Sequence, residues 1–306
     1  MLSKYVLLNT NYYILNTKNS MANLKEIRNR ISSINSTMQI TSAMKMVSAA
    51  KLKKAQDAIT AMRPYSSKLT ELLQSLSATL EGNVGGAYSE QREVNKVLLV
   101  AITSNRGLCG GFNSSIIKKT VTAISETYKD VEVDLLTIGK KGNDILSKEY
   151  NVIENNNSIF DNLTFDNVAE IAEQLMNLFV DGTYDKIEIV YNSFKNAATQ
   201  ITKLEQFLPI QPIESEESVT LDYIFEPSKE EIVLELIPKS LKTQLYKAIR
   251  DSYASEHGAR MTAMHKATDN AKELRDELKL TYNKARQAAI TNEILEIVGG
   301  AEALNN

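Results

Sequence analysis

Residues 238–292 read PKSLKTQLYKAIRDSYASEHGARMTAMHKATDNAKELRDELKLTYNKARQAAITN, and this stretch decides the fold. Pro238 and Ser240 predict a helix start. Apolar residues then follow at mostly helical spacing: Leu241, Leu245, Ile249, Ala259, Ala263, Ala267, Leu274, Leu278, Tyr282, Ala285 and Ala289. One helix of about 55 to 60 residues would be roughly 85 to 90 Å long. Since that exceeds the diameter of an ordinary domain, the helix needs a partner helix and then a partner protein.

The partner helix is predicted near the other end of the chain. No proline or glycine interrupts residues 21–63. The apolar positions alternate steps of three and four, which is the a/d pattern of a coiled coil: Leu24, Ile27, Ile31, Ile34, Met38 and Thr41. Beyond Thr41 small residues dominate, and they bury little area per residue. Weak burial over a great length favours helices that other subunits complete.

Composition excludes several classes of protein. The chain has 306 residues, 43% hydrophobic and 24% charged, which is typical of a globular protein. A single cysteine, Cys109, excludes an intramolecular disulfide, and with only two histidines the sequence argues against a zinc site. No apolar run reaches the ~18 residues of a membrane span.

Charge is distributed unevenly along the chain. Residues 21–63 carry eight Lys or Arg and two Asp or Glu. Residues 239–292 carry eleven Lys or Arg and six Asp or Glu. The middle, residues 64–238, carries fourteen Lys or Arg and twenty-seven Asp or Glu, and is therefore acidic. Each single charge on the helices is most simply a solvated one. The segregation as a whole indicates that the two long helices meet acidic surfaces.

The first twenty residues differ in character from the helical stretch that begins at Met21. They lack the long apolar region and cleavage site of a secretory signal. They also contain no arginine, which argues against a mitochondrial transit peptide. We expect residues 1–20 to be a disordered upstream extension, with Met21 as the functional start. The remaining division is 21–80 for N-terminal helices, 81–237 for an α/β domain and 238–306 for the long C-terminal helix.

The middle of the chain alternates strand and helix patterns. A second helical run follows Pro64, and residues 81–86 form a linker. Strands are predicted at 97–102, 131–138 and 187–191, helices at 116–128, 140–150 and 168–180, and a further strand at 199–208. The acidic residues 214–217 are interpreted as a loop. This alternation predicts an α/β domain with a mainly parallel sheet.

Two glycine-containing turns are candidate sites. Residues 104–112 (SNRGLCGGF) follow the first strand and precede a helix, where a nucleotide-binding loop would lie. The stretch is neither G-x-G-x-x-G nor a P-loop, so a tight structural turn is the simpler interpretation. The same holds for residues 139–142 (GKKG). Cys109 has no histidine near it in sequence, which argues against a catalytic cysteine.

Several motifs resemble a known family. Residues 290–303 (ITNEILEIVGGAEA) resemble the C-terminal signature of the gamma subunit of F-type ATP synthases, and residues 40–52 (ITSAMKMVSAAKL) resemble its N-terminal helix. Residues 106–111 (RGLCGG), 267–270 (ATDN) and 282–287 (YNKARQ) match it too. The resemblance covers residues 21 to about 301. The cysteine pair of the chloroplast relatives is absent.

The resemblance implies a fold and a function. The N- and C-terminal helices would form an antiparallel coiled coil, with a Rossmann-like α/β domain between them. The chain would be the non-catalytic central rotor shaft that couples proton flow through the membrane c-ring to ATP synthesis at the alpha and beta subunits. Its partners would be alpha, beta, epsilon and the c-ring. It would bind no cofactor, metal or nucleic acid, and would lie peripherally on the cytoplasmic face of the bacterial inner membrane.

The resemblance also implies contact residues. Met44, with Lys45 beside it, would meet an acidic loop of beta. Four further residues would engage alpha or beta loops: Arg260, Gln287, Thr291 and Glu293. Tyr223 and Glu226 would contact the c-ring.

Two other functions remain open from the sequence. A nucleotide-binding α/β enzyme would require a phosphate loop and would bind nucleotide as an isolated chain. A coiled-coil nucleic-acid binder would use the basic helices, and its affinity would fall steeply with salt.

Overall fold

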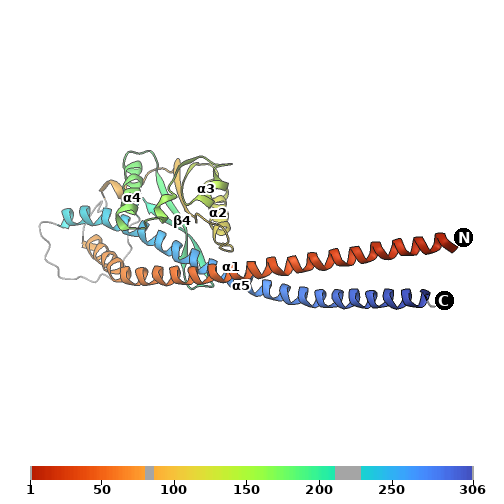
Figure 1. Cartoon of the computed structure of the whole chain (residues 1–306). Coiled ribbons are helices and arrows are strands. Elements are labelled where there is room, and N and C mark those ends of the chain that lie inside the picture. The colour runs from red at the N-terminus through yellow and green to blue at the C-terminus, as the bar shows by residue number, and fades with distance from the viewer. Residues whose placement is uncertain (1, 80–85, 211–228, 305–306) are drawn as a thin grey trace. The chain divides into compact units, whose positions relative to one another are not determined.

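The computed structural model describes the backbone of residues 2–79, 86–210 and 229–304, and most of their side chains from Leu24 onward (Figure 1). Its elements in chain order are α1 (Leu2–Thr79), η1 (Gly86–Ser89), β1 (Lys96–Ile102), α2 (Phe112–Thr122), η2 (Ala123–Thr127), β2 (Glu132–Ile138), α3 (Lys140–Leu146), β3 (Val152–Asn155), η3 (Ser158–Phe160), α4 (Phe165–Val180), β4 (Lys186–Phe194), β5 (Gln200–Leu208) and α5 (Lys229–Leu304). The chain divides into two units. The α/β body is residues 46–263, and the helix pair is residues 1–45 with 264–306.

The two long helices run through the prolines that predict helix starts. Pro64 lies inside α1 and Pro238 inside α5, so both predicted starts are wrong. An internal proline costs about 3 kcal/mol or more because it removes a backbone hydrogen bond. Around Pro238, Ile237 and Leu241 are both buried in the body, and their packing carries the helix across the proline. Helix α1 is assigned from Leu2, while the expectation that residues 1–20 are an upstream extension stays a prediction.

The α/β body contains a five-stranded sheet in the order β3-β2-β1-β4-β5. Strands β1 to β4 are parallel and β5 pairs with β4 antiparallel, so the mainly parallel sheet is confirmed. The expected strand at 199–208 is β5. Strand β3 is not among the predicted strands, because its four residues are too few for a clear pattern.

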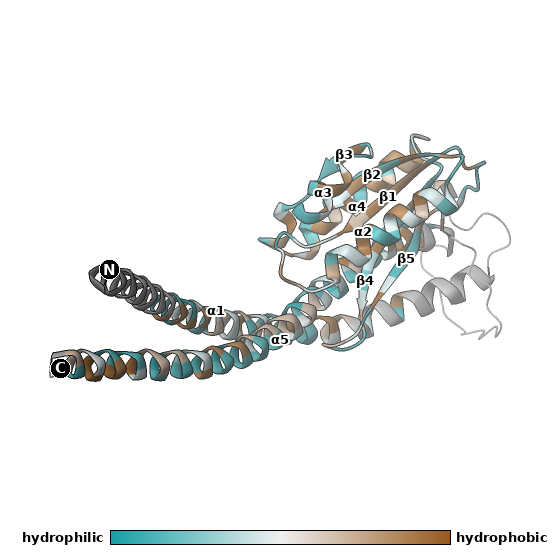
Figure 2. Cartoon of the chain, turned by 90° about the vertical axis from the view of Figure 1, so that its right-hand side faces the viewer, coloured by the Kyte–Doolittle hydropathy of each residue, from teal (hydrophilic) through white to brown (hydrophobic). Residues whose placement is uncertain are grey.

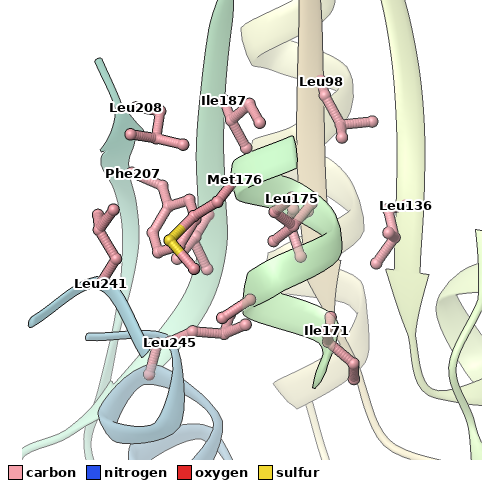
Figure 3. Packing of buried hydrophobic residues seen from close by; sticks show 14 of the residues in the cluster. Leu98, Leu136, Ile171, Leu175, Met176, Ile187, Phe207, Leu208, Leu241 and Leu245 are labelled. Carbon is pink, nitrogen blue, oxygen red and sulfur yellow. The ribbon is translucent and has the colours of Figure 1, made fainter. Parts of the chain in front are cut away.

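Both faces of this sheet are covered, as the continuous apolar run in β1 predicts. Leu98, Val100 and Ile102 pack on one side with α4 and the 237–249 part of α5, and Figure 3 shows this cluster from close by. Val97, Leu99 and Ala101 pack on the other side with α2 and α3 residues. The alternation follows from the two-residue period of a strand.

The helix pair is an antiparallel coiled coil (Figure 1). Thr41 is hydrogen-bonded to Thr268 (Oγ1–Oγ1 2.8 Å), and the Arg28 guanidinium donates to the Tyr282 hydroxyl at 2.7 Å. On α1 the expected a/d positions from Leu24 to Thr41 are all buried or half-buried. On α5 the predicted Ala267 is half-buried, and the other less exposed positions from residue 264 onward step by four and three: Met264, Thr268, Ala271, Arg275, Leu278, Tyr282, Ala285 and Ala289.

The α5 register differs from the predicted one around Leu274. The apolar pattern predicts Leu274 in the seam, but Leu274 is exposed and Arg275 is half-buried there. The physical reason is the fixed alternation of steps, which places residue 275 between Ala271 and Leu278. Apolar character alone therefore selects the wrong neighbour.

Candidate functional site

A buried polar cluster of the α/β body centres on Arg260 of α5. Its Nη1 donates to Glu256 Oε1 at 2.5 Å, and its Nη2 donates to the backbone carbonyls of Arg106 (3.1 Å) and Gly107 (3.3 Å). The Arg260 and Glu256 side chains are only 8% and 10% exposed. Arg260 is thus committed to partners inside the chain, and its expected contact with a partner subunit stays a prediction.

Burial shifts the pKa values of this cluster. Burial raises the pKa of the Glu256 carboxyl, and the nearby Arg260 charge opposes that rise. Burial, reinforced by the positive charges of Arg260 and Lys51, lowers the pKa of His257 to about 3. His257 is therefore neutral at pH 7. Its ring packs edge-on against the Tyr253 ring, with 4.5 Å between the ring centroids. The i, i+4 spacing of Glu256 and Arg260 is a sequence signal that could have identified this pair.

The loop after β1, residues 103–111, is held by hydrogen bonds within the chain. The Ser104 amide donates to Asn113 Oδ1 at 2.9 Å, and the Ser104 hydroxyl donates to the Arg106 carbonyl at 2.6 Å. Leu108 has a left-handed backbone (φ 61°) and an exposed side chain, which is unusual outside glycine. Cys109 is buried against Ser104, and burial raises the pKa of its thiol. A buried, protonated thiol is a poor nucleophile.

The carboxyl ends of β1 and β4 are where an open α/β fold binds nucleotides. Here α5 residues contact that edge. The Ser255 hydroxyl donates to the Asn192 carbonyl of β4 at 2.9 Å, and the Ser252 hydroxyl lies 3.5 Å from the Ile102 carbonyl of β1. The chain's own helix therefore occupies the edge that the nucleotide-binding alternative requires.

The second glycine turn, residues 139–142, is structural. Gly139 has φ 108°, and a Cβ at this position would lie 2.2 Å from the Thr103 carbonyl oxygen. The Gly142 amide donates to the Thr103 hydroxyl at 2.8 Å. The turn thus closes on the end of β1, as its simpler interpretation predicts.

The predicted contact residues that the structure describes are divided between the two units, with Arg260 in the body and the others in the helix pair. Met44 and Lys45 are half-buried on α1 in the helix pair. Gln287, Thr291 and Glu293 are exposed on α5, where the Thr291 hydroxyl donates to the Gln287 carbonyl at 2.9 Å. Tyr223 and Glu226 lie outside the described residues.

The last turns of α5 expose large apolar side chains. Figure 2 shows this hydrophobic stretch near the C-terminal end of the helix. The exposed residues are Ile290, Ile294, Leu295, Ile297 and Val298, with Ile297 71% exposed. Contiguous exposed apolar surface marks a site of protein–protein contact.

Metal-binding clusters and membrane spans are both absent from the described ranges. No group of three or more His, Cys, Asp or Glu residues there could hold a metal ion. None of the helices, within the part of the chain that the structure describes, is long and apolar enough to cross a membrane.

Comparison with known proteins shows one consistent similarity. The family model described as ATP synthase matches residues 23–304. The ATP synthase gamma chain of Flavobacterium johnsoniae is 76% identical over 286 residues, which are 93% of this chain and 100% of the relative.

Solved structures show the same similarity. The central stalk and c-ring of the Tetrahymena thermophila mitochondrial ATP synthase include a chain with TM-score 0.57 and 27% identity, covering 74% of this chain and 99% of that one. A chain from the Euglena gracilis mitochondrial ATP synthase matches with TM-score 0.67 at 20% identity, covering 92% of this chain and 95% of that one, which shows the fold.

Proposed function

We propose, from the premise that this chain belongs to the ATP synthase gamma-chain family, that it is the central stalk of a rotary ATP synthase. The single observation that carries this function is the 76% identity over 93% of the chain. The matching family model spans residues 23–304, which contain most of α1 and all of α5. As a gamma chain it is a non-catalytic subunit, so ATP chemistry takes place on its partners.

The exposed surfaces of the helix pair support this role. A coiled coil that leaves Ile294, Leu295 and Ile297 exposed has apolar area for partner loops to cover. An asymmetric stalk presents different contacts to each surrounding subunit as it turns. Such differential contacts are the physical requirement for coupling one conformational state to another.

The partners follow from the same family. They are the alpha and beta subunits around the helix pair, together with epsilon and the c-ring. Met44, Lys45, Arg260, Gln287, Thr291 and Glu293 are the proposed alpha or beta contacts, and Tyr223 and Glu226 the proposed c-ring contacts. The chain is a peripheral component, and we place it on the cytoplasmic face of a bacterial plasma membrane.

Reconstitution tests the proposal. Alpha and beta subunits assembled with this chain should turn a probe attached to the chain when ATP is added. The pure chain alone should hydrolyse no ATP. Turnover by the pure chain, or an active complex in which the probe never rotates, would overturn the assignment.

A further inference from the structure

We propose that Glu256 is a positioning residue that holds the Arg260 guanidinium across the loop after β1, so that the 252–262 part of α5 and the sheet of the α/β body turn as one piece. The inference rests on the proposed function, because α5 carries torque only if the chain is a rotating stalk. It concerns residues 103–111 and 252–262, all of which belong to the α/β body.

The guanidinium connects segments that are far apart in the sequence. Arg260 lies on α5, and the Arg106 and Gly107 carbonyls that accept from its Nη2 lie in the loop after β1. Nη1 donates to Glu256 while Nη2 donates to the two loop carbonyls at 3.1 and 3.3 Å. The single ammonium of lysine cannot reproduce this division between two rigidly spaced nitrogens. Arg260 therefore fixes the angle of α5 about its own axis relative to this loop.

Glu256 is required because the guanidinium is buried. An unpaired charge at 8% exposure would be strongly unfavourable. Glu256 lies one helical turn before Arg260 and accepts from Nη1, which leaves Nη2 directed at the loop. Glu256 therefore acts on the loop through Arg260.

The loop passes force on to the sheet. The Arg106 carbonyl accepts from both the Arg260 guanidinium and the Ser104 hydroxyl. Ser104 follows β1 almost directly, and its amide is bound by Asn113 of α2. A twist applied to α5 thus reaches β1 and α2 through a short series of hydrogen bonds.

Neighbouring residues of α5 also pack closely against the carboxyl end of β4 and the residues that follow it. Ser255 donates to Asn192, and the Thr262 hydroxyl donates to the Ala197 carbonyl at 3.1 Å. A Cβ on Gly258 would lie 3.2 Å from Ala197 Cα, so only glycine permits this approach without a shift. These contacts are neutral, and the Glu256–Arg260 pair supplies the charge-assisted bonds, which are the stronger kind.

The experiment measures torsional compliance in the reconstituted complex. A bead is attached through a cysteine introduced at exposed Lys148 of the body (Lys148→Cys), alpha and beta are immobilised, and rotation is stalled. Glu256→Gln should widen the variance of the bead angle at least twofold while the ATP hydrolysis rate stays within twofold. The matched control is Glu173→Gln, which removes the half-exposed ion pair between α4 and Lys242 of α5 and should leave the variance unchanged.

Hydrogen exchange on the full-length chain gives an independent measurement if Glu256→Gln does not assemble. Arg260→Lys keeps the positive charge but loses the two rigidly spaced nitrogens, so amides of residues 104–111 should exchange at least tenfold faster while β2 amides do not change. An unaltered bead variance with Glu256→Gln, or unaltered loop exchange with Arg260→Lys, overturns the inference. The wild-type complex separates the two proposals: if it fails to rotate, the stalk function itself is wrong.

Discussion

The α/β body and the helix pair use their apolar residues differently. In β1 of the body, Val97 to Ile102 are all 0% exposed and are covered on both faces. In the helix pair, Ile27 is the most buried of the predicted isoleucines at 8%, and Ile31 and Ile34 are half-buried. The body thus completes its own core, whereas the helix pair retains apolar and polar surface for partners. Substitutions of buried residues should therefore destabilise the isolated body most, whereas substitutions of exposed residues in the helix pair should act mainly in the complex.

The largest expected effect is in the body. Leu175 of α4 is 0% exposed in the main core, and Leu175→Ala should lower the free energy of unfolding by about 2 to 5 kcal/mol, because it leaves a cavity. Urea unfolding of the isolated chain measures this change. The control is Leu280→Ala, which changes an exposed side chain of α5 and should alter the free energy of unfolding by no more than about 0.5 kcal/mol. Equal losses at the two positions would remove the contrast between the units.

The second prediction uses the buried histidine of the body. Because the pKa of His257 falls from 6.5 to about 3 on folding, the unfolded chain binds the proton more readily. Stability from neutral His257 is present above pH 6.5 and is lost as the pH falls towards 3, which amounts to about 2 kcal/mol between pH 7 and pH 5.

Urea midpoints at the two pH values, compared with those of His257→Gln, test this expectation. The comparison with the variant is needed because the Glu256 pKa is raised, which acts in the opposite direction as the pH falls. The wild type should lose about 2 kcal/mol more than the variant on acidification. Parallel pH dependences would mean that His257 titrates normally.

The third prediction addresses the helix pair directly. Ile31→Ala removes a half-buried seam side chain and should cost about 1 to 2 kcal/mol, less than a core substitution because less area is buried. Amide exchange in residues 24–45 should accelerate while β1 amides remain protected. Acceleration of both would show that the two units unfold together.

Much of this division can be predicted from the amino-acid sequence. The 3–4 spacing from Leu24 to Thr41 predicts the N-terminal seam, and the run at 97–102 predicts the buried strand. Local signals fail at Pro238, where buried neighbours on both sides override the helix-breaking tendency, and at Leu274, where register outweighs apolarity. The family motifs indicate Arg260 as a contact, but no sequence signal places its guanidinium on the Arg106 and Gly107 carbonyls, because that contact depends on the tertiary fold.

The last prediction concerns the exposed polar residues of the helix pair. Gln287 and Glu293 are exposed, so Gln287→Leu or Glu293→Leu should change the stability of the isolated chain by no more than about 0.5 kcal/mol. In the complex, a partner group buried against them and left without its hydrogen bond costs about 1 to 3 kcal/mol. Each substitution should therefore lower the steady-state ATPase rate of the reconstituted complex several-fold.

Lys279→Leu provides the control for this prediction, since it places the same side chain at another exposed position of α5 outside the proposed contact set. It should leave the ATPase rate within twofold of wild type. Full activity with both Gln287→Leu and Glu293→Leu would make these residues ordinary solvated surface. If either substitution unfolded the isolated chain, these residues would instead be needed for the chain's own stability. The helix pair would then not depend on partner subunits at these positions, and its contrast with the self-sufficient body would not hold there.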